Sequence, residues 1–361
     1  MRSRNTRRKS TMAKASNAFA AAMLFALAWS LPVRAQSIQS TPSASPLYKE
    51  FVDEAGRTVR VPQPVLRIIS LAPSLTETIY ALGLQDRLIA DTDFCDFPAD
   101  AQKKTKVGGG LNPSLEQIVA LKPDLVLLAK SFNRIETLHA LETLGIPAYG
   151  TEPHTVQQII SSTERLAGVL GAPEAGSALS ADLQRRLSDL QQHLNGFPPR
   201  RVLFVVWSDP LISIGRDTFI ADALKHAGAS SIVDSAQDWP QMSLEEVVRL
   251  QPDFLVFAGS HAEAGQNDIE VLAERPGWRG LDAVRNRHFA MISDAVNRPA
   301  PRIVSAIEDL ARQLHPEAFV PLPDDEKEKK APPTAEPQLS TVALESHAAD
   351  TAQMEACACA P

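Results

Sequence analysis

The chain has 361 residues, which is long enough for two domains, and its composition is that of a globular protein except for a high count of 27 prolines. The formal charge is −7, and it falls to −14 when the first 35 residues, which hold seven Lys or Arg and no acid, are left out. An acidic chain of this kind lacks the basic footprint of nucleic-acid binders, so no nucleic-acid partner is expected.

Residues 1–35 are typical of a secretory signal peptide. A basic stretch at 2–14 precedes an apolar run at 18–29, and Val-Arg-Ala at 33–35 has the small-x-small pattern of a cleavage site. The apolar run is shorter than the about 20 residues that a membrane span needs. We expect cleavage after Ala35 and an exported, soluble protein. An uncleaved N-terminal anchor is the alternative, and the segment leaves open whether export is by the Sec or the twin-arginine route.

From residue 51 onward, segments with strand-like patterns alternate with segments of helical period. The patterns predict, in chain order, a hairpin at 51–62, a strand at 67–72, a helix through Leu75, Ile79 and Leu82, a strand at 88–94, a helix at 133–144, a strand at 147–149 and a helix at 155–170. After residue 198 the alternation restarts with a strand at 201–207, and it ends in a helix at 301–314. This order indicates an α/β fold.

One helix-to-strand unit occurs twice in the chain. The sequence SLEQIVALKPDLVLLA at 114–129 returns as SLEEVVRLQPDFLVFA at 243–258, with eight of the sixteen positions identical. In each copy we expect a Ser at the helix N-cap and a Glu, Glu116 or Glu245, in the first turn, where its charge suits the helix dipole. Proline ends each helix, and the strand that follows is apolar enough to be buried on both faces, as in a parallel sheet covered by helices.

Between the two copies lies one long segment of helical period, at 173–195. Its leucines recur at spacings of four or three residues, which predicts an amphipathic helix of about six turns. We therefore predict two α/β lobes with parallel-type sheets, bridged by one long α-helix. The expected parts are a signal peptide (1–35), a linker and hairpin (36–64), an N-terminal lobe (65–171), the bridging helix (172–197), a C-terminal lobe (198–315) and a disordered tail (316–361).

The sequence offers little for catalysis or metal binding. The glycine-rich GGGLNPS at 108–114 lacks the lysine of a phosphate-binding loop, and Ser74 and Ser243 lie outside a GxSxG motif and are predicted as helix caps. The histidines are scattered, and Cys95, Cys357 and Cys359 are an odd set without a zinc-site spacing. We predict no enzyme activity, no cofactor and no metal site; an exported hydrolase is the alternative from another functional class.

Two segments stand out as candidates for ligand binding. They are DWPQMS at 238–243, with an aromatic residue just before the second repeated unit, and ISDAVNRPAPR at 292–302, where a strand meets a helix. Ligands of α/β proteins bind where strand ends meet helix starts, and Trp239 with Asp294 and Arg298 would suit a large, amide-rich ligand. The alternative is a core tryptophan, a capping aspartate and a solvated arginine.

Taken in order, these features resemble a known family. The export signal, the hairpin, RIISLAPSLTE, CDFP, KPDLVLLA, the long helix, WPQMSLEE and SDAVNRPAPR are together similar to the periplasmic binding proteins of ABC importers for iron chelates and cobalamin. The resemblance covers about residues 50–315, and it is closest to the members that bind cobalamin. It implies two lobes bridged by a helix, a ligand held in the cleft between them, a periplasmic location and an ABC permease in the inner membrane as partner. A monomer is expected.

The resemblance also implies roles for single residues. Trp239 would pack on a corrin ring, and Asp294 and Arg298 would hydrogen-bond its peripheral amides. Phe94 stands in the place of a tyrosine at the cleft mouth. Glu116 and Glu245 match two glutamates, one on each lobe, that dock on arginines of the permease.

Two aromatic residues of the cobalamin-binding members are replaced in this chain. Gly110 stands where they have a tryptophan in the first lobe, and Ile212 stands where they have a phenylalanine in the second. Trp207 is a candidate replacement. The aromatic platform of this chain is therefore expected to be built differently.

The leading hypothesis is a corrinoid-binding protein that delivers its ligand to an ABC permease. The alternative cargo is a ferric siderophore or haem, for which the sequence offers Tyr80, Tyr149, His154 and Arg216 as candidate contacts. A further alternative is a signalling or chaperone domain that carries no ligand.

Overall fold

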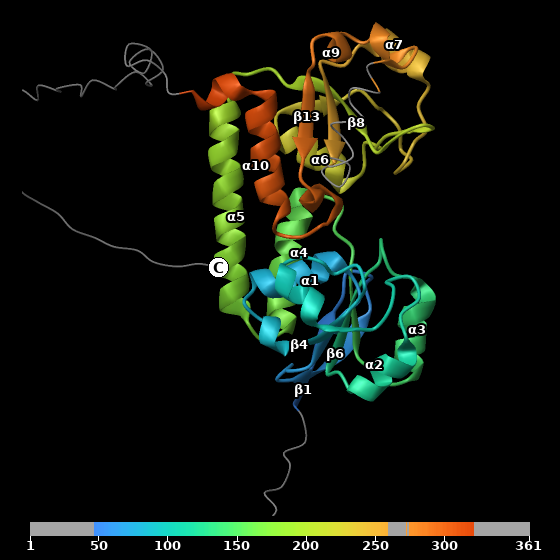
Figure 1. Ribbon diagram of the computed structural model, residues 1–361. Coiled ribbons are helices and arrows are strands. Elements are labelled where there is room, and N and C mark those ends of the chain that lie inside the picture. The colour runs from blue at the N-terminus through green and yellow to red at the C-terminus, as the bar shows by residue number, and fades with distance from the viewer. Residues whose placement is uncertain (1–46, 259–271, 273, 321–361) are drawn as a thin grey trace, which may run out of the picture. The chain divides into compact units, whose positions relative to one another are not determined.

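The computed structural model describes residues 47–258, 272 and 274–320. The predicted signal peptide, the predicted linker up to residue 46, the pair Cys357 and Cys359, and the predicted tail from residue 321 onward lie outside the described residues. The described residues form two α/β lobes, drawn from blue to green and from yellow to red in Figure 1.

Five parallel strands form the sheet of the first lobe, in the order β5-β4-β3-β6-β7. The elements of this lobe are β3 (Ile68–Ser70), α1 (Pro73–Ala81), the 3₁₀ helix η1 (Gln85–Arg87), β4 (Leu88–Asp91), η2 (Ala99–Lys103), β5 (Thr105–Lys106), α2 (Leu115–Leu121), β6 (Leu125–Ala129), α3 (Ile135–Thr143) and β7 (Ala148–Thr151). The strand order reverses between β3 and β6, and the carboxyl ends of two such strands frame a ligand-binding crevice in α/β proteins.

Four parallel strands form the sheet of the second lobe, in the order β11-β8-β12-β13. The elements of this lobe are β8 (Arg200–Val205), α6 (Phe219–His226), β11 (Ala229–Ser231), α7 (Leu244–Leu250), β12 (Phe254–Ala258), η4 (Trp278–Gly280), α9 (Asp282–Arg285), β13 (Phe289–Ile292), η5 (Asp294–Asn297) and α10 (Ile303–Leu314). Here the order reverses between β8 and β12, so the second lobe has a crevice of the same kind.

Both faces of each sheet carry core residues, which explains why strands such as β6 and β12 are apolar throughout. Along β6, Leu125 and Leu127 belong to one core cluster, whereas Val126 belongs to another. Along β8, Phe204 and Leu203 are divided in the same way. Because successive side chains of a strand point to opposite faces, each sheet has a core on both sides, as the predicted parallel sheets require.

Two helices connect the lobes, α4 (Val156–Val169) and α5 (Pro173–Leu194). They pack on each other, and α5 also lies beside α10, as Figure 1 shows. Leu187 in the second half of α5 lies in the core of the second lobe, and Ala175 in its first half packs on the core of the first lobe. α4 runs in the opposite sense, with Ile160 in the second-lobe core and Leu166 in the first-lobe core. The predicted bridging helix is confirmed, and α4 bridges the lobes as well.

The first copy of the repeated unit closes its helix on the neighbouring strand. The Asp124 carboxylate accepts the backbone N–H of Arg67 at 2.8 Å. The Arg67 guanidinium in turn donates to the carbonyls of Leu121 and Lys122, at 2.6 and 3.1 Å, which are otherwise unpaired at the end of α2. Lys122 adopts the left-handed conformation, with φ 47°, that ends the helix.

The second copy repeats this arrangement contact by contact. Asp253 accepts the backbone N–H of Arg201 at 2.7 Å, and the Arg201 guanidinium donates to the carbonyls of Leu250 and Gln251 at 2.8 and 3.2 Å. Gln251 has φ 45°, close to that of its counterpart in the first copy. The Pro-Asp pair of each copy is thus explained by packing within each lobe, whereas the shared glutamates have no side-chain partner among the described residues.

Several boundaries differ from the predicted ones. The hairpin of β1 (Leu47–Val52) and β2 (Thr58–Gln63) begins four residues earlier than predicted. β4 ends at Asp91, not at 94, because the chain turns where the Cys95 N–H donates to the Thr92 carbonyl at 3.0 Å. Ser74 is not a helix cap: α1 starts at Pro73, with Ala72 at the N-cap, and Ser74 is buried inside the first turn.

Two further differences concern the second lobe. β8 ends at Val205, and Trp207 belongs to a separate short hairpin of β9 (Trp207–Ser208) and β10 (Leu211–Ile212). The tail was predicted from residue 316, but Pro316–Phe319 forms the 3₁₀ helix η6, whose Phe319 ring stacks on His193 of α5 with centroids 5.4 Å apart. Across the described ranges, no helix combines the length and the apolar composition that crossing a membrane requires.

Candidate ligand-binding site

A cavity of about 590 Å³ lies at the crevice of the first lobe and is shared with the second lobe. Its lining consists of Ala72, Pro73, Ser74, Asp93, Phe94, Asp96, Ala129, Ser131 and Phe132 from the first lobe and Phe219, Ile220, Trp239, Asn297, Arg298 and Pro299 from the second. The residues after β3 and those at the end of β6 line it together, as expected at a point where strand order reverses. Phe94, Trp239 and Arg298 were predicted as site residues, and the structure brings all three to this cavity.

Phe94 is joined in the cavity wall by Phe132, which the sequence did not single out. The two rings meet edge to face, with centroids 6.3 Å apart and planes at 87°. A Cβ atom on Gly110 would lie 2.0 Å from the Phe132 ring, so only glycine leaves room for this ring. Asn133 fixes the arrangement, because its Nδ2 donates to the carbonyls of Gly110 and Leu71, each at 2.8 Å.

Gly110 therefore takes part in the site indirectly. It is not among the lining residues, but the space that its missing side chain leaves is filled by the Phe132 ring. The aromatic group that the family pattern places at this position reaches the wall from the end of β6 instead. The signal in the sequence was an aromatic residue three positions past an apolar strand, where ligand-binding loops of α/β proteins begin.

Trp239 is held at the cavity by backbone hydrogen bonds on both of its sides. The Ser213 N–H donates to the Pro240 carbonyl at 3.0 Å, and the Gly215 N–H donates to the Asp238 carbonyl at 2.9 Å. A Cβ atom on Gly215 would lie 1.9 Å from the carbonyl oxygen of Gln237, so the close approach of the two segments requires glycine. The Trp239 side chain itself is 55% exposed, which leaves a large aromatic face for a ligand.

Trp207 and Asp294 were also predicted as site residues, and neither is among the lining residues of this cavity. Trp207 pairs with Ile212 in the β9–β10 hairpin, and its Nε1 donates to the Asp209 carbonyl at 2.7 Å. Asp294 is half-buried at the start of η5, four residues before Arg298.

Arg298 lies in an ion-pair network that joins the two lobes through Glu77. Glu77, on α1, is buried, and its Oε1 accepts a hydrogen bond from Nη1 of Arg298 at 2.8 Å. Arg302 binds the same carboxylate with two hydrogen bonds, Nη2 to Oε1 at 2.8 Å and Nε to Oε2 at 2.9 Å. Asp96 completes the network, with its Oδ1 2.6 Å from Nη1 of Arg298. Two guanidinium groups thus face two carboxylates.

The network shifts the ionisation of its members. Burial disfavours the charge of Arg298, but its hydrogen bonds to Asp96 and Glu77 outweigh this effect and hold the pKa of Arg298 above its ordinary value. The hydrogen bond from Arg298 holds the pKa of Asp96 below its ordinary value. Because breaking a buried pair leaves a charge without a partner, the Glu77 contacts favour the arrangement in which the lobes meet here.

Glu116 and Glu245, the predicted docking residues, lie in the first turns of α2 and α7, one helix on each lobe (Figure 1). Both side chains are exposed, and among the described residues neither makes a hydrogen bond or an ion pair. Glu246, the neighbour of Glu245, instead pairs with Arg249 at 3.6 Å. The predicted N-cap bond is present in α2, where Ser114 accepts the Gln117 N–H at 3.3 Å, whereas Ser243 occupies the N-cap of α7 without one.

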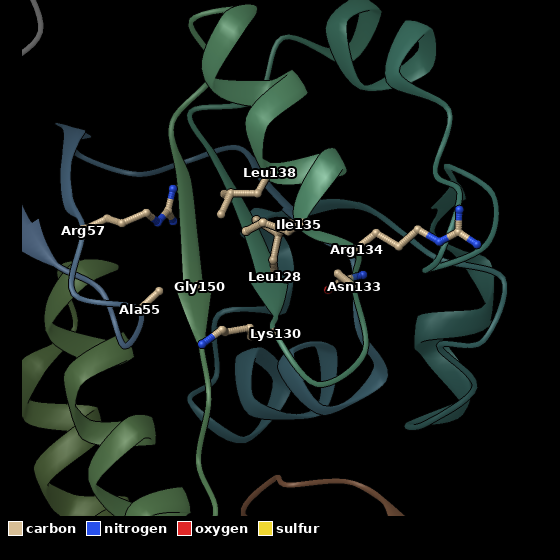
Figure 2. A pocket seen from close by; sticks show the side chains of 9 residues that line it. All are labelled: Ala55, Arg57, Leu128, Lys130, Asn133, Arg134, Ile135, Leu138 and Gly150. Atoms are coloured by element: carbon tan, nitrogen blue, oxygen red, sulfur yellow. The ribbon is translucent and has the colours of Figure 1, made fainter.

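A second cavity, of about 320 Å³, lies within the first lobe (Figure 2). The figure shows Leu128, Ile135 and Leu138 close together in its wall, while the Arg134 side chain points away from them. Two of the three cations that line it are already neutralised: Arg57 pairs with Asp53 and Glu142, and Lys130 pairs with Glu152 at 2.6 Å. The larger cavity, with exposed aromatic faces and a donor in its wall, is therefore the better candidate for a ligand site.

In the part of the chain that is described, no group of three or more His, Cys, Asp or Glu is placed to hold a metal ion.

Comparison with known proteins identifies the family. The family model described as "Periplasmic binding protein" matches residues 68–296. A vitamin B12-binding protein of Vibrio parahaemolyticus is 33% identical over 255 residues, which are 70% of this chain and 90% of that protein. The crystal structure of a periplasmic vitamin B12-binding protein of Vibrio cholerae has a TM-score of 0.61 and 29% identity and covers 72% of this chain and 99% of that one.

The fold has a wider distribution than these relatives. A periplasmic haem-binding protein from Roseiflexus has a TM-score of 0.60 at 24% identity, covering 70% of this chain and 99% of that one, and this likeness concerns the fold alone. The family model, the 33% identical relative and the structure from Vibrio cholerae all agree with the two lobes and bridging helices described above. The chain belongs to the periplasmic binding protein family, whose members are the substrate-binding components of ABC transporters.

Proposed function

We propose that the chain binds a corrinoid of the cobalamin class in the 590 Å³ cavity and delivers it to an ABC permease. The observation that carries this proposal is the convergence of Trp239, Phe94 and Phe132 with the donor Arg298 on one cavity. A corrin ring offers a broad apolar face to the aromatic groups and carries amide carbonyls at its edge for the arginine. The names of relatives above 30% identity support the same ligand.

The lining residues favour a corrinoid over the alternative cargoes. A ferric siderophore is usually anionic and needs several cations, whereas the charged residues that line this cavity are Asp93, Asp96 and Arg298. Haem-binding sites commonly offer a tyrosine or histidine to the iron, and the described lining contains neither. Tyr149, one of the candidates considered for haem, is buried in the core of the first lobe.

We propose further that Glu116 and Glu245 are the contacts with the permease. Each is a solvent-exposed carboxylate without a partner among the described residues, and each stands at the same step of the repeated unit in its lobe. A pair of this kind suits two arginines on a two-fold symmetric partner, because charge-assisted hydrogen bonds set orientation as well as affinity.

The remaining parts of the proposal concern how the protein works in the cell. The protein acts in the periplasm as a monomer after cleavage behind Ala35, and the pattern of its first 35 residues supports the export and the cleavage. Its role is binding and delivery, without catalysis and without a resident metal or cofactor.

Isothermal titration of the purified protein with cyanocobalamin tests the central claim. We expect one ligand per chain and saturation well below about 100 µM, as for a binding protein with micromolar or tighter affinity. The absence of heat at that concentration would contradict a corrinoid ligand. The visible spectrum of protein purified from its own periplasm distinguishes the cargoes, because corrinoid and haem absorb differently.

A further inference from the structure

The CDFP segment, residues 95–98, lies at the junction of the two lobes. Its contacts there are made with arginines of the second lobe. Asp96 reaches Arg298, and the guanidinium carbon of Arg302 lies 3.9 Å from the centre of the Phe97 ring. Cys95 anchors the segment on the first lobe, because its buried sulfur accepts a hydrogen bond from Thr76 Oγ1 at 3.2 Å. Asp96 and Phe97 are therefore held in position toward the second lobe.

The two arginines use their donors differently. Arg302 binds Glu77 through Nε and Nη2 and stacks on Phe97, so one edge and one face of its guanidinium group join the lobes. Arg298 places only Nη1 against Glu77 and Asp96, and its Nη2 and Nε make no hydrogen bond with the described residues. Arg298 lines the cavity, whereas Arg302 does not. Arg298 thus keeps donors for a ligand while its charge is already balanced.

Asp96 determines which ligand groups can accept a hydrogen bond from these donors. Its carboxylate is 59% exposed and lines the same cavity, so it lies where a group bound to Arg298 must also lie. A neutral carbonyl can accept from Nη2 or Nε while Asp96 keeps Nη1. A ligand carboxylate at the same place would face Asp96 at short range and would have to displace it to gain the charge of Arg298.

We infer that Asp96 sets the charge specificity of the cavity: by neutralising Arg298 at its wall, it selects ligands whose peripheral groups are neutral amides and rejects ligands that carry carboxylates there. The inference rests on the proposed function, since it specifies the chemistry of the ligand in the same cavity.

Two ligands with one ring system test it. Dicyanocobinamide carries amides around the corrin ring, and dicyanocobyrinic acid carries carboxylates at the same places. We expect the wild type to bind the amide form more tightly, and Asp96→Asn to reduce this preference about tenfold through tighter binding of the acid, as expected when a charge-assisted pair becomes available. Asp96→Glu should keep the wild-type preference.

Asp93→Asn is the matched control. Asp93 lines the same cavity, and its carboxylate makes no ion pair with the described residues, so this variant removes an equal charge without releasing Arg298. We expect it to change the preference by less than about threefold. Equal changes in the two asparagine variants would show a general charge effect and overturn the inference. An unchanged preference in a folded Asp96→Asn protein would also overturn the inference. If Asp96→Asn does not fold, Asp96→Ser provides the same test.

Haemin, which carries two propionates, separates this inference from the proposed function. A wild type that binds neither corrinoid and binds haemin only weakly would overturn the proposed function alone. In that case the inference still requires Asp96→Asn, and not Asp93→Asn, to bind haemin more tightly. A wild type that binds none of the three ligands would overturn both.

Discussion

At the scale of single residues, two tryptophans of nearly equal exposure allow stacking on a ligand to be separated from general surface effects. Trp239 is 55% exposed and Trp207 is 52% exposed, but only Trp239 lines the large cavity. We expect Trp239→Ala to weaken cyanocobalamin binding at least about tenfold, because it removes both apolar contact and ring stacking. Trp207→Ala should change the affinity less than about twofold, within the usual effect of a surface substitution. Titration calorimetry of the two variants measures both affinities. Equal losses of affinity would show that the ligand does not bind in the large cavity.

A second residue-scale prediction concerns Asp91, at the end of β4. Its side chain is buried, Oδ1 accepts from Lys106 Nζ at 2.7 Å, and Oδ2 has no partner among the described residues. Burial raises the pKa of Asp91 to about 6, and the hydrogen bond from Lys106 only partly opposes this shift. The folded protein therefore holds the proton more tightly than the unfolded chain, and the contribution of Asp91 to stability falls as pH rises from about 4 to about 6.

Asp91→Asn should lose this pH dependence. Relative to the wild type, the free energy of unfolding of the variant should increase between pH 4 and pH 7 by up to about 3 kcal/mol, since one pKa unit corresponds to about 1.4 kcal/mol. Urea unfolding of both proteins at the two pH values measures the difference. Asp93→Asn, at an exposed position two residues on, should show no comparable change. A constant difference between Asp91→Asn and wild type would mean that Asp91 titrates normally.

At the scale of elements, the position of Trp239 depends on how its segment packs on residues 213–215, which follow β10. Gly215 allows the Gln237 carbonyl to approach, and an added methyl group would lie 1.9 Å from that oxygen. We expect Gly215→Ala to push the Trp239 segment away and to weaken cyanocobalamin binding about tenfold or more, with the rest of the fold intact. Calorimetry gives the affinity, and far-ultraviolet circular dichroism checks the fold.

Gly168→Ala is the control for this substitution. Gly168 lies inside α4, and no atom beyond its chain neighbours and the backbone of its own helix is within 4 Å of the position its Cβ would take. Alanine there should leave ligand affinity unchanged and raise stability by up to about 1 kcal/mol, as glycine is a poor helix former. Normal ligand binding by Gly215→Ala would show that the Trp239 segment does not need the close approach.

Most of the architecture was predictable because the signals are local. The apolar strands at 125–129 and 254–258, the Pro-Asp pairs before them and the leucine spacing of α5 each follow from a short stretch of sequence. The bridging role of α4 was not predictable, since periodicity shows which face of a helix is apolar but not that its two halves enter different cores.

The site was predictable only in part, for a similar reason. Trp239 and Arg298 stand in segments with a recognisable pattern, and both line the cavity. Phe132 lines it because Gly110, 22 positions earlier, has no side chain in that space, and such a relation exists only in three dimensions. The pairing of Asp96 with Arg298 joins residues about 200 positions apart, and the pattern of neither sequence segment predicts this contact.

At the scale of the whole molecule, the two lobes present the same carboxylate at the same step of the repeat. The local explanation of Glu116 and Glu245, as partners of helix dipoles, accounts for at most about 1 kcal/mol each and requires no permease. Glu136, in the first turn of α3, and Glu246, in the first turn of α7, have the same charge and a comparable place in a helix. These two residues therefore supply a double variant that is matched in lobe, charge and helix position.

We expect the double variant Glu116→Ala and Glu245→Ala to bind cyanocobalamin with unchanged affinity but to reduce its uptake by cells about tenfold or more, because two charge-assisted contacts with the permease are lost. Glu136→Ala with Glu246→Ala should leave both quantities near wild type. If both double variants lower the melting temperature equally and leave uptake unchanged, the helix-dipole explanation suffices. If the first variant loses ligand affinity, the glutamates act on the cavity and not on the permease. Reduced uptake with intact ligand binding is the result that only a docking role explains, because the two glutamates would then be needed after the ligand has been bound, at the delivery step.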